Sequence, residues 1–376
     1  MSATKQPLQN PFKPTAGKMP PELIGRDQVI EEFRDGLANG PGAPERLMRV
    51  SGVRGMGKTV MLSEFKRIAL VEPKKWTVVS ETASPGFSAR ILEALSRTSH
   101  ASSMKIQPTA FGVSLGSLEI ERASLDLREA MIKATEKNQG LLITLDEVQD
   151  ASLEETKALA IAVQHIISED RNIAFVFAGL PSMISEVVNG NTLTFLRRAI
   201  PVNLEAIPIS EVAFSLADTM RRLGRMTIKD DLVDELAHAS AGYPFMVQLV
   251  GYQTWQVAFR RLGREAGEVS AADVEKGISE ALARFDAMVI EPAVHHVSPS
   301  AMRYLLAMAE DQGKASETSE VAARLGMSLN GASPVRAKLI KDGIIEAADR
   351  GKVSFTIPYM ARYLEHNRQE LEQEVY

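Results

Sequence analysis

The sequence contains no cysteine, which excludes several classes of protein. Without thiols there can be no disulfide framework, no thiolate zinc or iron–sulfur site and no cysteine nucleophile. Residues 1–22 are rich in proline and lysine and lack the apolar core of a signal peptide, so they are expected to form an extended N-terminal arm. Secretion is therefore disfavoured, and we expect a cytoplasmic protein.

Long apolar runs and an excess charge of one sign are also missing. The longest run, 173–180, is far shorter than the ~20 residues that cross a bilayer. Lys+Arg 43 nearly balance Asp+Glu 48, which leaves a formal net charge of −5. A chain-wide attraction to nucleic acid or anionic lipid is excluded, so any polyanion must bind locally. The length of 376 residues and the ordinary hydrophobic content of 45% predict a globular protein of two or three domains.

Between residues 23 and 207, short apolar runs alternate with amphipathic stretches, as is typical of a parallel sheet covered by helices. Strands are expected at 47–51, 76–81, 141–145, 173–178 and 200–204. Helices are expected between them at 58–70, 88–99, 124–137 and 153–167. The segment 105–121 alternates around two glycines and predicts an inserted hairpin.

From residue 208 the pattern becomes purely helical and predicts a small helical lid domain over 208–288. Its helices are expected at 210–223, 231–240, 245–262 and 271–288. Prolines predict a linker at 289–299. The last part, 300–376, holds three helical stretches and two short strands around Asp349-Arg-Gly-Lys352, the pattern of a winged helix-turn-helix.

The strongest motif is Gly52-Val-Arg-Gly-Met-Gly-Lys-Thr59, which fits G-x-x-x-x-G-K-[ST] between a predicted strand and a predicted helix. The backbone N–H groups of such a loop and the positive end of the helix cradle a polyphosphate. Lys58 would reach the β- and γ-phosphates, and Thr59 would coordinate Mg²⁺. The alternative is a glycine-rich turn with a solvent-facing lysine. We expect ATP to be bound by Gly52, Val53, Arg54, Gly55, Met56, Gly57, Lys58, Thr59 and Val60.

A second motif is the apolar run 141–145, which ends on Asp146 and Glu147 and resembles a Walker B element. Asp146 is predicted to lie near Mg²⁺, and Glu147 is predicted to polarise the attacking water. The alternative is a strand that leaves the sheet on two solvated acids. The distance between the two motifs leaves room for an extra strand, which favours the additional-strand class of P-loop ATPases.

Three more segments complete a resemblance to a known family: Leu23-Ile-Gly-Arg-Asp27, Phe195-Leu-Arg-Arg198 and Gly242-Tyr-Pro244. With the two motifs, they resemble the AAA+/STAND-type ATPases, especially the replication-initiator (origin-recognition) ATPases and their bacterial relatives. The resemblance covers residues 20–285, and the C-terminal winged helix matches the initiators' domain order. It implies an α/β P-loop NTPase fold of the additional-strand type with a helical lid.

The resemblance also implies roles for particular residues. Ile24, Gly25 and Arg26 would line the adenine pocket, and Pro244 would approach the nucleotide base. Arg197 or Arg198 would act on the γ-phosphate of a neighbouring subunit in a homo-oligomer. Pairing of these arginines with surface carboxylates, and plain helix punctuation by the Gly-Tyr-Pro segment, stay open as alternatives.

The partner of the winged helix is the least determined feature of the sequence. Residues 296–376 are close to charge balance, yet basic residues cluster on the expected recognition helix and wing. These residues are Arg336, Lys338, Lys341, Arg350 and Lys352. Their side chains can contact the phosphates of DNA. A winged helix that contacts protein is the alternative.

The leading hypothesis is an ATP-binding and ATP-hydrolysing switch whose lid passes the nucleotide state to a DNA-bound winged helix. One alternative is a STAND-type signalling or defence ATPase whose winged helix contacts protein. Another is a transposition or plasmid-maintenance accessory ATPase that oligomerises on DNA.

Overall fold

The computed structural model describes residues 8–98, 117–189, 194–295 and 297–375, which pack as two compact units. The sheet unit comprises the described residues of Arg26–Gly52 and Gly57–Glu205. The helical unit comprises those of Met1–Gly25, Val53–Met56 and Ala206–Tyr376. Across this part of the chain, no helix combines the length and the apolar character that crossing a bilayer requires.

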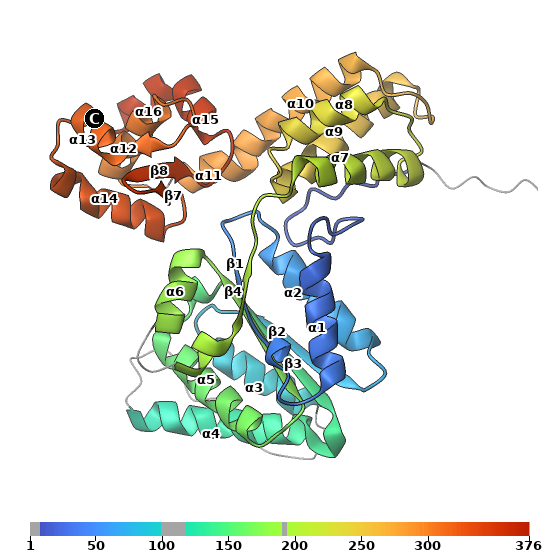
Figure 1. Cartoon of the computed structure of the whole chain (residues 1–376), viewed down its shortest axis with the longest axis vertical. Coiled ribbons are helices and arrows are strands. Elements are labelled where there is room, and N and C mark those ends of the chain that lie inside the picture. Colours follow the sequence, from blue (N-terminus) through green and yellow to red (C-terminus); the bar gives the residue numbers. More distant parts are fainter. Residues whose placement is uncertain (1–7, 99–116, 190–193, 296, 376) are drawn as a thin grey trace, which may run out of the picture. The chain divides into compact units, whose positions relative to one another are not determined.

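The sheet unit is built on five parallel strands in the order β2-β3-β4-β1-β5 (Figure 1). The strands are β1 (Leu47–Ser51), β2 (Trp76–Thr82), β3 (Gly140–Asp146), β4 (Ile173–Gly179) and β5 (Ile200–Asn203). Each lies within about one residue of the range expected from its apolar run, so the predicted parallel sheet is confirmed. The extra strand β4 lies between β1 and β3 and pairs with both.

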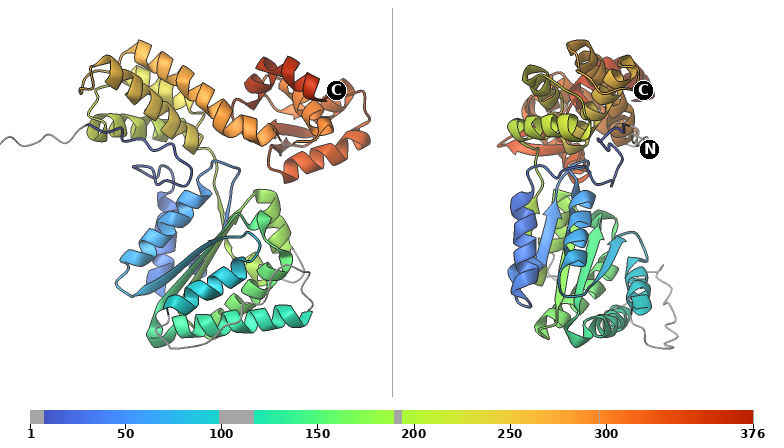
Figure 2. Two further views of the ribbon diagram at one scale, coloured as in Figure 1. Left: turned by 180° about the vertical axis from the view of Figure 1, so that it is seen from behind. Right: turned by 90° about the vertical axis from the view of Figure 1, so that its right-hand side faces the viewer.

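Helices cover both faces of this sheet, as the views in Figures 1 and 2 show. One face carries α1 (Asp27–Asn39) and α2 (Lys58–Val71), and the other carries α3 (Phe87–Thr98), α4 (Ser117–Ala134), α5 (Leu153–Ser168) and α6 (Pro181–Asn189). Every residue of β3 and β4 is buried, as a central parallel strand covered on both faces requires.

Most of the segment predicted as a hairpin, 105–121, lies outside the described residues. Its last part is helical instead, because α4 begins at Ser117. After Gly116 the sequence holds no glycine or proline up to Asn138, so nothing interrupts a helix there.

From residue 206 onward, the helical unit contains four lid helices, as the helical periodicity of the sequence predicted. They are α7 (Ile209–Asp218), α8 (Asp230–Ala239), α9 (Pro244–Arg261) and α10 (Ala271–Phe285). Two π-helical turns extend them: η5 (Thr219–Leu223) follows α7, and η6 (Asp286–Ile290) follows α10. The residues expected as a linker start in η6 and continue as α11 (Glu291–Val294). Pro292 lies in α11, directly after the π-helical turn.

A winged helix-turn-helix follows. Its helices are α12 (Pro299–Ala309), α13 (Thr318–Arg324) and α14 (Leu329–Lys341), and its antiparallel sheet has the order β6-β8-β7. The strands are β6 (Ser316–Glu317), β7 (Ile345–Asp349) and β8 (Lys352–Phe355). Helix α14 begins well before Pro334, because the Ser328 side chain accepts the Gly331 N–H at 3.1 Å and caps the helix. Two further helices, α15 (Met360–His366) and α16 (Arg368–Val375), were not predicted.

The described part of the N-terminal arm packs on the lid. Phe12 is only 1% exposed and lies against Gly251 of α9, where a Cβ would come 2.4 Å from the Phe12 ring. The Asn10 side-chain amide donates a hydrogen bond to the Tyr252 carbonyl at 3.0 Å. Sequence patterning missed this anchor because a single phenylalanine among prolines carries no periodic signal.

Candidate nucleotide-binding site

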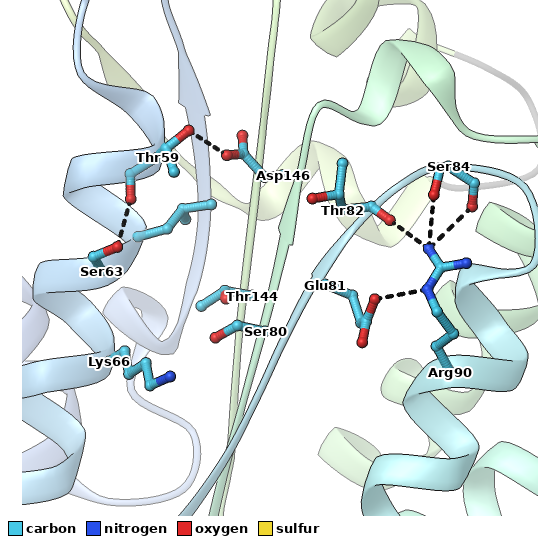
Figure 3. Close-up of a pocket in the computed structure, with 11 residues that line it drawn as sticks. Thr59, Ser63, Lys66, Ser80, Glu81, Thr82, Ser84, Arg90, Thr144 and Asp146 are labelled. Carbon is cyan, nitrogen blue, oxygen red and sulfur yellow. Dashed lines mark hydrogen bonds and ion pairs between the residues drawn. The ribbon is translucent and has the colours of Figure 1, made fainter. Parts of the chain in front are cut away.

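The sheet unit brings the predicted magnesium ligands together. The Thr59 hydroxyl at the start of α2 donates to Asp146 Oδ2 at the carboxyl end of β3, at 2.5 Å (Figure 3). Both side chains line a pocket of about 440 Å³. Hydroxyl and carboxylate oxygens are the hard ligands that Mg²⁺ prefers, so these residues fit the ion expected there.

The environment of Asp146 also favours a cation. Its side chain is 8% exposed, and burial is the main reason why its pKa lies above the usual value. The hydrogen bond from Thr59 and the charge of Lys58 oppose this rise, whereas the negative charge of Glu147 adds to it. A bound cation would favour the ionised carboxylate and offset the effect of burial.

Lys58 is the first residue of α2 and is only 5% exposed. Its ammonium donates to the Gly52 carbonyl at 2.9 Å and therefore lies back over the loop of its own motif. The Gly52 N–H donates to the Gly179 carbonyl at 3.4 Å, which ties the base of the loop to the end of β4. A phosphate in the loop would compete for Lys58 with a neutral carbonyl, and the ammonium binds an anionic acceptor more strongly than a neutral one.

Glu147 follows β3 with a left-handed backbone, φ 56°. For a residue other than glycine such a conformation costs energy, and strained residues of this kind cluster at functional sites. The Gln149 amide donates to the Glu147 carboxylate, and the Gln149 side-chain oxygen accepts the Leu180 N–H at 3.4 Å. Gln149 therefore connects the candidate base to the residue that follows β4. No sequence signal marks Gln149, because a glutamine two residues beyond Glu147 belongs to neither of the two motifs.

The opposite wall of the pocket is held by Arg90 of α3, which was not predicted either (Figure 3). Its guanidinium donates to Glu81 at 2.9 Å and to the carbonyls of Thr82 and Ser84 at 2.9 and 3.3 Å. Thr82 is the register partner of Asp146 across the β2–β3 pair. Arg90 thus orders the strand end that lies beside the candidate magnesium ligand.

The residues that the family resemblance implied are distributed over both units. In the sheet unit, Arg26 donates to the Glu205 carbonyl at 2.8 Å. Arg197 and Arg198 are exposed at the end of the 3₁₀ turn η4 (Thr194–Arg198), directly before β5. Their exposure is compatible with a trans-acting role and with surface pairing, so the alternative stays open.

In the helical unit, Ile24 is partly buried and Gly25 is exposed at the end of the N-terminal arm. Pro244 opens α9 directly after Tyr243, whose backbone is the N-cap. A proline in the first turn fits helix punctuation, and its contact with a nucleotide base stays a prediction. The loop residues 53–56 also belong to this unit, where the Tyr243 hydroxyl donates to the Arg54 carbonyl.

The five predicted DNA contacts lie on α14 and on the turn and strand of the wing: Arg336, Lys338, Lys341, Arg350 and Lys352. Lys338 and Lys352 form ion pairs within the domain. Lys338 pairs with Asp342 at 3.0 Å, and Lys352 pairs with Glu317 at 3.2 Å. All four partners are well exposed, and exposed ion pairs are weak enough to exchange for phosphate.

Comparison with known proteins identifies the segment that carries this site. Residues 22–176 match the family model of the AAA ATPase domain, and this range includes Lys58, Thr59, Asp146 and Glu147. Residues 287–364, which include most of the winged helix, match a domain of unknown function (DUF8462). A search of curated proteins found no match.

Solved structures share the fold of the segment that this family model matches and of the parts that follow it. The ORC2 protein of Aeropyrum pernix, in ADPNP–ADP complexes, aligns with a TM-score of 0.64 at 16% identity over 96% of this chain and 97% of its own. The A. pernix ORC1 protein in complex with DNA aligns with a TM-score of 0.51 at 17% identity over 95% of this chain and 96% of its own. Cdc6p from Pyrobaculum aerophilum aligns with a TM-score of 0.51 at 16% identity over 96% of this chain and 97% of its own. The predicted α/β P-loop NTPase fold is therefore confirmed.

Proposed function

We propose that the protein is a nucleotide-dependent switch that binds and hydrolyses ATP in its AAA ATPase domain and binds DNA through its winged helix. The observation that carries the proposal is the meeting of Thr59 and Asp146 at 2.5 Å beside the buried Lys58. The shared fold supports it further, since the ORC2 structure contains ADPNP and ADP and the ORC1 structure contains DNA.

In this proposal the motif loop binds the phosphates. Lys58 exchanges the Gly52 carbonyl for phosphate oxygens, and the N–H groups of residues 52–60 donate to the same groups. Thr59 and Asp146 would hold Mg²⁺, which supplies positive charge against the phosphates when it is bound. Ile24, Gly25, Arg26 and Pro244 would surround the base.

Hydrolysis is assigned to Glu147, whose carboxylate orients a water molecule and accepts its proton. Gln149 holds that carboxylate in place and is a positioning residue. Arg197 or Arg198 would complete the site of a neighbouring copy, so the proposal includes a homo-oligomer formed on ATP or DNA.

The proposal also assigns the parts of the chain. Residues 1–22 are the N-terminal arm, 23–207 the ATPase domain, 208–288 the lid, 289–299 the linker and 300–376 the DNA-binding winged helix. ATP and ADP can shift the winged helix only if they bind two states of the protein with unequal affinity.

A calorimetric titration with Mg·ATP and Mg·ADP tests the nucleotide site. Lys58→Ala should abolish binding of both, because it removes the cation that faces the phosphates. Lys74→Ala is the matched control, since Lys74 is an exposed lysine in the loop after α2, and it should bind as the wild type does. Wild-type affinity in Lys58→Ala would contradict the proposed site.

A second function, a signalling ATPase whose winged helix contacts protein, is favoured by one specific observation. Met327, just before the recognition helix α14, and Leu329, its first residue, are 44% and 48% exposed. Exposed apolar side chains at the helix end that usually meets base edges favour contact with the apolar surface of a protein.

A further inference from the structure

Tyr243 contacts the apex of the motif loop. Its hydroxyl donates to the Arg54 carbonyl, and its side chain is only 1% exposed. Gly55 has φ +80°, and a Cβ there would come 2.1 Å from the Tyr243 hydroxyl oxygen. Both the backbone conformation and the tyrosine therefore require glycine at this position. Burial raises the pKa of Tyr243, so the hydroxyl keeps the proton that it donates.

Phe285, the last residue of α10, packs against Tyr243. The two ring centroids are 5.4 Å apart and the rings are nearly perpendicular at 88°, the favourable edge-to-face arrangement. Phe285 is fully buried and is followed at once by the π-turn η6. A π-turn within a helix is a common site of functional bending, so the ring lies at a candidate hinge.

Phe285 also contacts Tyr359, which comes from the winged-helix part of the chain. Their centroids are 6.4 Å apart at 81°. The Tyr359 hydroxyl donates to the Ala239 carbonyl at the end of α8, at 2.9 Å. The Arg362 guanidinium lies 5.7 Å over the Tyr359 ring and pairs at 2.5 Å with Asp286, the first residue of η6.

We propose that Tyr243 is a positioning residue for the nucleotide loop and that Tyr243, Phe285 and Tyr359 form an aromatic relay that transmits the nucleotide state to the winged helix. The proposal rests on the proposed function and deepens it by naming the residues that regulate it. The relay joins one contact at the loop, one at the hinge η6 and one at the N-terminus of α15.

Nucleotide binding would change a contact at the base of the motif loop. Lys58 donates to the Gly52 carbonyl, and a bound phosphate would replace that contact. Only residues 53–57 separate these two, so a change at the base of the loop reaches Arg54 and Gly55. Because protein interiors are close-packed, the buried ring of Tyr243 cannot absorb a displacement and passes it to Phe285.

One hydroxyl deletion and one ring deletion test the relay. Tyr243→Phe keeps the ring and removes the bond to the loop, so Mg·ATP affinity should fall by about three- to tenfold, the usual contribution of one hydrogen bond. Tyr359→Leu removes the ring that packs against Phe285, together with the bond to Ala239, and should leave nucleotide affinity unchanged. In both variants the ratio of DNA affinities with ATP and with ADP should move toward one. Tyr252→Phe, also on α9 but outside the relay, is the matched control and should keep both quantities.

The measurements are calorimetric titration of the nucleotides and fluorescence anisotropy of a duplex DNA, on the full chain, with thermal melting to verify folding. If the wild type binds DNA equally with ATP and ADP, the switch fails and the relay is overturned with it. If the wild type responds to nucleotide and both variants keep its full ratio, the proposed function stands and the relay alone is overturned. Unchanged Mg·ATP affinity in Tyr243→Phe overturns its positioning role.

Discussion

Two adjacent acids at the end of β3 have different surroundings. Asp146 is buried and accepts a hydrogen bond from Thr59, whereas Glu147 is partly exposed, has a left-handed backbone and is held by Gln149. A buried carboxylate opposite a hydroxyl suits a cation, and a more accessible carboxylate suits a water molecule. Neighbours in sequence are thus given different chemistry by the side chains that face them.

Glu147→Gln should therefore separate binding from turnover. The amide has the same shape but cannot accept the proton, so ATP affinity should stay within a factor of about two while hydrolysis falls by about 10²–10⁴-fold, the usual contribution of a general base. Phosphate release in single-turnover experiments and titration of ATP measure the two quantities. Glu154→Gln in the first turn of α5 should hydrolyse normally. Unchanged turnover in Glu147→Gln would remove this residue from the mechanism.

The burial of Asp146 leads to a prediction about how stability depends on pH. Its pKa is raised by burial, so the folded protein binds this proton more tightly than the unfolded chain. The stability that the group contributes is therefore lost as the pH rises from about 3.8 through the raised pKa. Without nucleotide or Mg²⁺, Asp146→Asn should raise the melting temperature at neutral pH and lose that advantage near pH 3.8. A lower melting temperature at neutral pH would contradict this account.

Helix α1 and strand β1 are joined by the buried Arg46. It donates to the carbonyls of Gly36 and Leu37 near the end of α1, both at 2.7 Å, and to the Asn172 side chain at 2.5 Å. Its guanidinium lies 5.3 Å from the centre of the Trp76 ring, and burial lowers its pKa to about 10. A cation at the C-terminus of a helix satisfies the last carbonyls and interacts favourably with the helix dipole.

Arg46→Met should destabilise the sheet unit by about 2–4 kcal/mol, because it leaves buried carbonyls without donors. Urea unfolding followed by circular dichroism measures the change. Arg49→Met, three residues further along and in β1, is less buried; it is the matched control and should cost less than about 1 kcal/mol. Equal losses in the two variants would contradict a specific role of the hydrogen bonds that Arg46 donates.

Considered as a whole, the molecule has little net charge, so DNA binding depends on a few local cations. Arg350 and Lys352 lie in the wing, and Lys352 exchanges Glu317 for phosphate in the proposed complex. The double variant Arg350→Ala/Lys352→Ala should bind duplex DNA more weakly, with the slope of log affinity against log salt reduced by about 0.9 per lost phosphate contact. Anisotropy at several salt concentrations measures this slope.

Arg303→Ala provides the control for that experiment, because Arg303 is an exposed cation on α12 and belongs neither to α14 nor to the wing. Its salt slope should equal that of the wild type. Absence of DNA binding by the wild type with ATP, with ADP and without nucleotide would favour the protein-contacting alternative, for which the exposed Met327 and Leu329 are the first residues to test.

Local information in the chain was enough to predict the five strands and the lid helices, and it singled out the two motifs of the candidate site. Apolar runs of four to seven residues that alternate with amphipathic stretches are typical of buried parallel strands. A glycine-rich loop directly before a lysine at the start of a helix is typical of a phosphate-binding loop. The same information missed α1, α6, α15 and α16. It also placed part of a hairpin where α4 begins, because alternation around glycine resembles a strand pair.

Long-range packing settled the remaining features. Tyr243 lies 189 residues from its hydrogen-bond partner Arg54, and Phe12 is buried against Gly251. Likewise, Gln149 holds Glu147 only because β4 ends beside it. Such pairs leave no periodic trace, since each depends on how whole elements stack and on which side chains fill the space between them. Secondary structure and the motifs follow from neighbours along the chain. The residues that support the site from behind, such as Tyr243 and Gln149, follow from neighbours in space.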